Sequence, residues 1–172
     1  MPKKETIERA QRDQREGKSP STQAGEFVKE EMDEIRQGKH GARSTKQAIA
    51  IGLSKARRAG VKLPPPKKGA TTERTRRSAE RAYEAGQKHP HAPVNPRRSR
   101  AITRALKREG HEAASNKSLS LQARSQAARR TSAERTAIGR KAAATRLAHQ
   151  GHAERSRVAR RAARTRAMHK SS

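Results

Sequence analysis

The sequence predicts an all-α protein: a small antiparallel two-helix module, residues 25–63, flanked by basic arms that are largely disordered or transiently helical. Three observations support this fold class. Nine of the 21 large apolar residues lie between positions 27 and 63, where they follow helical spacing. Val, Ile, Leu and Phe make up only 17 of 172 residues, well below the ~20% under which a highly charged chain lacks a packed core. The net charge is +27, of which +21 lies beyond residue 63.

The first arm, residues 1–24, is predicted to be polar, with a marginal helix over residues 3–16. Opposite charges four positions apart, such as Glu5 and Arg9, contribute roughly 0.2–0.5 kcal/mol per pair, and no face of this helix is apolar. We expect the run from Gly17 to Ser21 to end it. The arm lacks the apolar stretch of a secretory signal, and no run of ~18 apolar residues occurs elsewhere, so neither export nor a membrane span is predicted.

The first helix of the module is predicted over residues 25–37. Val28, Met32 and Ile35 stand at i, i+4 and i+7, with Phe27 beside them, which is the spacing of one apolar helix face. Phe27 is therefore expected in the core. The opposite face is acidic, and the helix carries a net charge of −3.

The second helix is predicted over residues 45–59. Ser44 is a good N-cap with Gln47 at the capping-box position, and Gly60 followed by Val61 is typical of a Schellman ending. Residues 44–62 carry a net charge of +5. Because the two helices have opposite charge and are joined by a short glycine-containing loop, we expect them to pack antiparallel.

The remainder of the chain divides into three segments by composition. Residues 64–71 are a stiff Pro/Lys linker, and residues 72–112 are short basic helices, over 72–88 and 97–109, separated by a Pro-rich break. Residues 113–172 form an Arg/Ala-rich cationic tail with 15 cations and two acids. Within it, Thr131 and Glu134 form a capping box that opens a helix to about His149, which Gly151 closes. Nothing apolar holds these helices together, so we expect them to become stable on a polyanion.

The cations of the module, the linker and the tail are the predicted nucleic-acid-binding residues. Duplex DNA carries one charge for each ~1.7 Å of axis, so a stripe of guanidinium groups meets phosphates in many registers, and the Arg fork matches phosphate oxygens in pairs. Lys55, Arg58 and Lys62 form one predicted stripe on the second helix. The full predicted set is Lys55, Arg58, Lys62, Lys67, Lys68, Arg129, Arg130, Arg140, Lys141, Arg146, Arg157, Arg160, Arg161, Arg164 and Arg166.

The sequence offers little support for metal binding, catalysis or base stacking. There is no cysteine, and the seven histidines, with His89/His91 and His149/His152 as the nearest pairs, have no neighbouring acidic residues in sequence. They are predicted to be exposed, and no metal or other cofactor is expected. No nucleophile and base arrangement is evident, so we expect neither an enzyme nor a small-molecule substrate. Phe27 and Tyr83 are the only aromatic residues, too few for base stacking on single-stranded RNA.

The stretch from Gly25 to Gly60 resembles a family of small basic bacterial proteins of unknown function. The pattern E-M-x-E-[FIL]-x-x-G-K is met by Glu31, Met32, Glu34, Ile35, Gly38 and Lys39. The pattern K-Q-A-I-A-I-[AG]-L-S-x-A-R-x-A-G is met from Lys46 to Gly60, and the chain departs from the family at residues 40–43. Residues 99–130 are similar to a stretch of longer relatives. The resemblance implies a DNA-binding or histone-like protein without an assigned activity.

The sequence therefore predicts non-specific binding and charge neutralisation of nucleic acid, with duplex DNA preferred over RNA, by a nucleoid-associated, cytoplasmic protein. Two alternatives stay open. One is an RNA- or ribosome-associated basic protein. The other is an adaptor in which residues 25–63 bind a protein partner while the tail tethers it to DNA.

Overall fold

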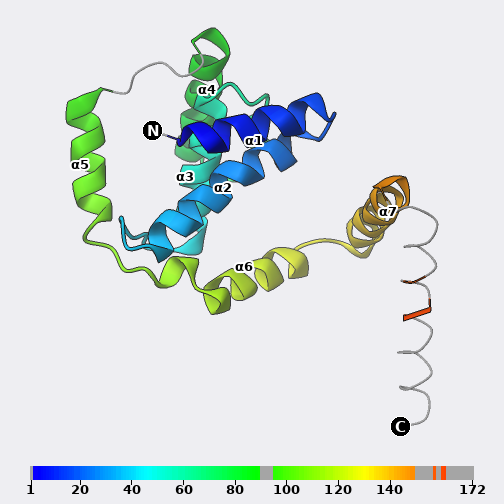
Figure 1. Ribbon diagram of the computed structural model, residues 1–172. Helices are drawn as coiled ribbons and strands as arrows, with labels where there is room; N and C mark the ends of the chain where they lie inside the picture. The colour runs from blue at the N-terminus through cyan, green and yellow to red at the C-terminus, as the bar shows by residue number, and fades with distance from the viewer. Residues whose placement is uncertain (1, 90–94, 150–156, 158–159, 162–172) are drawn as a thin grey trace. The chain divides into compact units, whose positions relative to one another are not determined.

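The computed structural model describes residues 2–89, 95–149, 157 and 160–161 (Figure 1). All regular structure in these residues is helical, which confirms the all-α class. The helices are α1 (Lys4–Arg15), α2 (Pro20–Arg36), α3 (Thr45–Arg58), α4 (Glu73–Lys88), α5 (Pro96–Leu106), the 3₁₀ turn η1 (Glu112–Ala114), α6 (Asn116–Ala128) and α7 (Ser132–His149). None of these helices is long and apolar enough to span a bilayer. The chain divides into two units, Met1–Ala123 and Arg124–Ser172.

The start of α2 differs from the sequence prediction. Ser19 is its N-cap, with the Ser19 side chain accepting from the backbone N–H of Thr22, and Pro20 is the first helical residue. The helix therefore begins before Gly25, because a Ser-Pro pair that ends one helix also suits the first turn of the next. α1 ends as predicted near Gly17, which has a φ of 72°.

The bounds of α3 agree with the prediction. Ser44 Oγ accepts from the Gln47 N–H at 3.2 Å, and beyond the helix Gly60 takes a φ of 91° while the Val61 N–H donates to the carbonyl of Ala56. One detail differs: the Gln47 side chain accepts from the N–H of Arg43 at 2.9 Å and not from that of Ser44.

The packed unit is larger than the predicted two-helix module. α2 packs most extensively on α3, and α1, α4 and η1 also lie against this pair. α1 has an apolar face, because Ala10 is buried in a core cluster and Ile7 packs against that cluster. Ala113 and Ala114, at the start of the predicted tail, are also buried, and Thr45 Oγ1 donates to the Ala113 carbonyl at 2.7 Å.

The core consists of two apolar clusters. Phe27, at 1% exposure, centres one of them, and Ile35, at 0%, belongs to the other, as the spacing in α2 predicts. Between the clusters, α2 and α3 approach so closely that a Cβ on Gly52 would lie 2.7 Å from the Cα of Val28. A Cβ on Gly86 would overlap the carbonyl oxygen of Arg57, so the backbones of α4 and the end of α3 are also in close contact.

α5 contributes no buried residue to the core. Two backbone hydrogen bonds join the loop after α2 to this part of the chain. The Gly41 N–H donates to the carbonyl of Leu106, the last residue of α5, at 2.9 Å, and the Ala42 N–H donates to the carbonyl of Gly110, beyond the helix, at 3.0 Å.

In the second unit, α7 opens with the predicted capping box. The Thr131 N–H donates to Glu134 Oε2 at 2.8 Å and the Glu134 N–H donates to Thr131 Oγ1 at 3.2 Å. The predicted closing residue, Gly151, lies outside the described residues.

Candidate nucleic-acid interface

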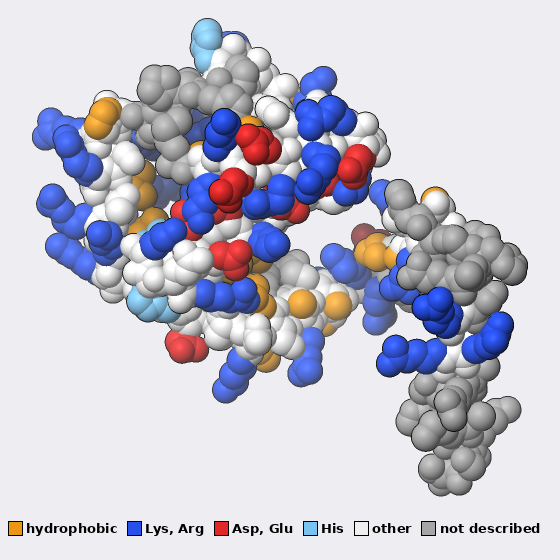
Figure 2. Space-filling view, viewed as in Figure 1, with side chains coloured by type: hydrophobic (Ala, Val, Ile, Leu, Met, Phe, Trp, Pro, Cys, Tyr) orange, Lys and Arg blue, Asp and Glu red, His pale blue; other side chains and the backbone are white. Residues whose placement is uncertain are grey.

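The outer face of α5 carries a stripe of arginines. Asn95 caps the helix by accepting from two backbone N–H groups, and Arg97, Arg100 and Arg104 follow at i, i+3 and i+7. All three are exposed, and no acid occurs between residues 95 and 108. Figure 2 shows the resulting row of Lys and Arg side chains along this helix. We call Arg97, Arg100 and Arg104 the α5 stripe.

Acidic residues in the helical bundle already pair with many of its cations. Arg9 Nε lies 2.6 Å from Glu26 Oε2, and Lys18 Nζ lies 2.8 Å from Asp13 Oδ1. Figure 2 accordingly shows acidic side chains among the basic ones over α1 and α2. In residues 95–149, by contrast, 14 cations stand against three acids. The cationic excess is thus concentrated in α5 and the segments that follow it.

In α4 the arginines are held by their own helix. Arg76 Nη2 lies 2.8 Å and Arg77 Nε 3.1 Å from Glu73 Oε1. Hydrogen bonds and charge from these two guanidinium groups lower the pKa of Glu73 to about 2. A phosphate would therefore have to compete with Glu73 for these two guanidinium groups.

The predicted ligands fall into separate groups. Arg58, Lys62, Lys67 and Lys68 are exposed at and beyond the end of α3 in the first unit. In the second unit the exposed cations of the predicted set are Arg129, Arg130, Arg140, Lys141, Arg146, Arg157, Arg160 and Arg161. Arg164 and Arg166 lie outside the described residues, so the four-residue stripe from Arg157 to Arg164 is described only in part.

The α5 stripe was absent from the predicted ligands. Its spacing is visible in the sequence, but similar spacing recurs in the tail, from Arg157 to Arg164. The opposite face of α5, with Ser99, Ile102, Thr103 and Leu106, lines a cavity. Because the partly apolar face of α5 lies towards the cavity, the arginines of the α5 stripe face solvent.

Lys55 does not belong to the exposed surface predicted for it. Its Nζ lies 2.7 Å from Glu31 Oε2 and 2.9 Å from Glu34 Oε2, and Glu31 is fully buried. Burial lowers the pKa of Lys55, but the hydrogen bonds and charges of the two carboxylates outweigh it, so this pKa lies above its ordinary value. For Glu34, burial acts to raise the pKa, and Lys55 more than offsets it, so the net direction is downward. Lys55 is therefore neutralised internally.

His40 also departs from the prediction. Its side chain is only 12% exposed, and Nε2 lies 3.6 Å from Glu31 Oε1 and 3.7 Å from Glu34 Oε2. The expectation of exposed histidines without acidic neighbours is wrong here, because the loop after α2 folds back over the acidic face of that helix. We call Glu31, Glu34, His40 and Lys55 the buried charge cluster.

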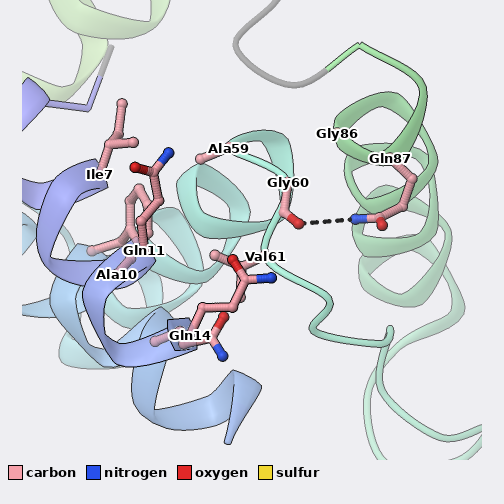
Figure 3. A pocket seen from close by; sticks show the side chains of 11 residues that line it. Ile7, Ala10, Gln11, Gln14, Ala59, Gly60, Val61, Gly86 and Gln87 are labelled. Atoms are coloured by element: carbon pink, nitrogen blue, oxygen red, sulfur yellow. Dashed lines mark hydrogen bonds between the residues drawn. The ribbon is translucent and has the colours of Figure 1, made fainter. Parts of the chain in front are cut away.

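Cavities among the described residues of the first unit include two that differ in size. The larger, about 470 Å³, lies against α1, α2, α3 and α5, and its walls include Ile51, Ile102 and the buried charge cluster. The smaller, about 280 Å³, is lined by glutamine amides and by apolar residues that include Ile7 and Val61 (Figure 3). At its edge Gln87 Nε2 donates to the Gly60 carbonyl at 3.2 Å. Neither cavity carries an exposed row of cations.

Comparison with known protein families finds a match to part of the chain. Residues 15–68 are similar to a family of unknown function, DUF6496. This stretch runs from the end of α1 through α2 and α3 into the Pro/Lys linker, about a third of the chain. It supports the resemblance to an uncharacterised family, and the family description assigns no activity. Neither the curated proteins nor the solved structures contain a match.

Proposed function

We propose that this protein binds nucleic acid without sequence preference, with duplex DNA favoured over RNA, and neutralises its charge. The observation that carries the proposal is the unpaired cationic excess of residues 95–149, 14 cations against three acids. The α5 stripe and the exposed cations of α7 are the principal residues that contact the phosphates. The role is binding without catalysis, exercised in the cytoplasm at the nucleoid.

The length of the α5 stripe suits a duplex backbone. Arg97 and Arg104 are seven positions apart, about 10 Å along a helix that rises ~1.5 Å per residue. A duplex presents about six phosphates over that length of axis, at ~1.7 Å per charge. Because no acid stands among the three arginines, each guanidinium can displace a condensed counterion without first breaking an ion pair.

The division of the chain gives each part a role in this proposal. The antiparallel pair of residues 25–63, together with the helices packed on it, is a folded support that positions α5. The segments beyond it are arms that become more ordered on the polyanion. Several cationic segments on one chain raise the effective concentration of each for the same duplex.

The test is the salt dependence of binding by the full chain. Fluorescence anisotropy with a labelled 30-base-pair duplex, at several salt concentrations, gives the slope of log K against log salt. If ten phosphates are contacted, that slope is about −9. Duplex RNA of the same sequence, at matched salt, tests the preference. A flat salt dependence would refute the proposal, and tighter RNA binding would favour the ribosome-associated alternative.

A matched pair of triple variants tests the α5 stripe. Changing Arg97, Arg100 and Arg104 to Gln removes three positive charges, and we expect the slope to become shallower by about 2.7, at ~0.9 per phosphate contact. Changing Arg74, Arg76 and Arg77 of α4 to Gln removes the same charge, but Arg76 and Arg77 are paired with Glu73. The second variant should therefore change the slope less. Equal changes would mean that only net charge matters.

An adaptor function is the second candidate. The cavity between α5 and the bundle favours it, because Ile102 is 49% exposed beside Ile51 at its wall. An adaptor would retain a defined protein when Arg97, Arg100 and Arg104 are changed to Gln, and lose it when Ile102 is changed to Glu. Capture that follows the arginines, and is abolished by nuclease, would assign the partner to nucleic acid.

A further inference from the structure

We propose that Glu31, Glu34 and His40 bind a divalent transition-metal ion of the zinc class. Each of these side chains offers one ligand atom, and the three atoms lie within 4.8 Å of one another. His40 Nε2 is 3.6 Å from Glu31 Oε1 and 3.7 Å from Glu34 Oε2. Ligands about 2.0–2.1 Å from a tetrahedral zinc ion stand about 3.3–3.4 Å apart, so small side-chain movements bring this set to metal-binding distances.

The hydrogen bond on the other side of the imidazole fixes its tautomer. His40 Nδ1 lies 3.1 Å from the Gly41 carbonyl oxygen, which can only accept, so Nδ1 carries the proton. In the neutral ring the lone pair is then on Nε2 and faces two carboxylate oxygens. A backbone carbonyl that orients the distal nitrogen in this way is the usual support of a metal-binding histidine.

An unpaired buried oxygen is the independent observation that points to a cation. Glu31 is fully buried, and its Oε1 has no hydrogen-bond partner among the described residues. Lys55 Nζ lies near the other oxygen, Oε2, at 2.7 Å. Two carboxylates and one ammonium carry a net charge of −1. An isolated buried carboxylate oxygen costs free energy unless a cation or donor reaches it.

The donor set selects the class of metal. One imidazole and two carboxylates suit zinc and its neighbours, whereas magnesium and calcium prefer sites built from oxygen alone. The cluster forms part of the wall of the 470 Å³ cavity, so an ion has a path from solvent. Lys55 opposes the ion electrostatically, which predicts a site whose affinity rises when this charge is removed.

The experiment titrates the full chain with Zn²⁺ alone by calorimetry at pH 7.5, and with Co²⁺ followed by visible absorption. One equivalent of Co²⁺ should give the d–d bands of a low-coordinate site. His40→Gln and Glu34→Gln should each lower Zn²⁺ affinity at least about tenfold, and Lys55→Met should raise it. His111→Gln, which removes an exposed histidine, is the matched control and should change nothing.

Two outcomes would overturn the metal assignment. One is equal Zn²⁺ affinity in the wild type, His40→Gln and Glu34→Gln, because the metal would then be bound by other groups. The other is the absence of one-equivalent Co²⁺ bands in the wild type. Circular dichroism of each variant establishes that it is folded, and the two ligand variants are independent of each other. No nucleic acid is present in this titration, so its result is separate from the proposed function.

Discussion

Changing Gly52 to Ala should destabilise the bundle, although Ala is the better helix former. A Cβ at this position would lie 2.7 Å from the Cα of Val28 and 3.0 Å from the carbonyl oxygen of Phe27. Carbon atoms in contact stand about 3.5–4.0 Å apart, so α2 and α3 must separate by roughly 1 Å at their crossing. The neighbouring atom is backbone and cannot turn away as a side-chain end would.

The magnitude follows from two opposing effects. Replacing Gly by Ala within a helix gains about 1 kcal/mol, and overpacking a core costs about 1–3 kcal/mol. The net change for Gly52→Ala is therefore a loss of about 0–2 kcal/mol. Gly25 in α2 is the matched control, because a Cβ there meets nothing within 4 Å in the described part of the chain. Gly25→Ala should gain about 1 kcal/mol.

The assay is urea unfolding of each full-length variant, followed by helix circular dichroism at 222 nm. The two variants should differ by about 1–3 kcal/mol, the overpacking term alone. In a thermal melt, where 1 kcal/mol corresponds to about 4 °C for a domain near this size, Gly25→Ala should melt well above Gly52→Ala. If both substitutions stabilise the protein equally, the close approach of α2 and α3 is refuted.

Two further predictions concern the edges of the bundle. Thr45→Val removes the hydroxyl that donates to the buried Ala113 carbonyl at 2.7 Å, so unfolding should require about 1–3 kcal/mol less free energy by urea titration, and a loss near zero would mean that η1 is not held there. Arg76 and Arg77 lower the pKa of Glu73 from 4.5 to about 2, so the stabilisation of α4 by this carboxylate is complete above about pH 4.5 and disappears as the pH falls through about 2. Glu73→Gln should remove that part of the acid dependence of helicity, and an unchanged acid titration would contradict the pairing.

The elements set by local signals were predictable from sequence. The bounds of α3 follow from Ser44 at its start and Gly60 at its end, and both act on residues within one turn. The placement of Phe27 and Ile35 in the core follows from helical spacing. The capping box of Thr131 and Glu134 is equally local, and it forms as predicted.

The features that were missed depend on contacts between distant residues. Ala113 carries no sequence signal of burial, because alanine occurs throughout the tail, and its partner Thr45 lies 68 positions away. The buried charge cluster joins Glu31 to Lys55 and His40 across a loop. Lys55 was therefore predicted to be an exposed nucleic-acid-binding residue, although its neighbours in the fold are carboxylates.

The exposed face of α5 was likewise not predictable from the sequence, because it depends on tertiary contacts. Its arginine spacing is readable, but its outward direction depends on the opposite face, with Leu106, which lies towards a cavity. Sequence periodicity gives two faces of a helix without saying which one meets solvent. The tail beyond His149 lies largely outside the described residues, and the predictions for it stand as predictions.

The predominance of alanine in the core has a thermodynamic consequence. Among the described residues, nine of the thirteen buried apolar side chains are alanines, so unfolding exposes little hydrocarbon surface for the length of the chain. Exposure of apolar surface sets the heat capacity of unfolding, and this protein should fall below the usual ~12–15 cal/mol/K per residue. A small heat capacity change flattens the dependence of stability on temperature. The bundle should thus lose little stability on cooling, because it has so few large side chains to bury.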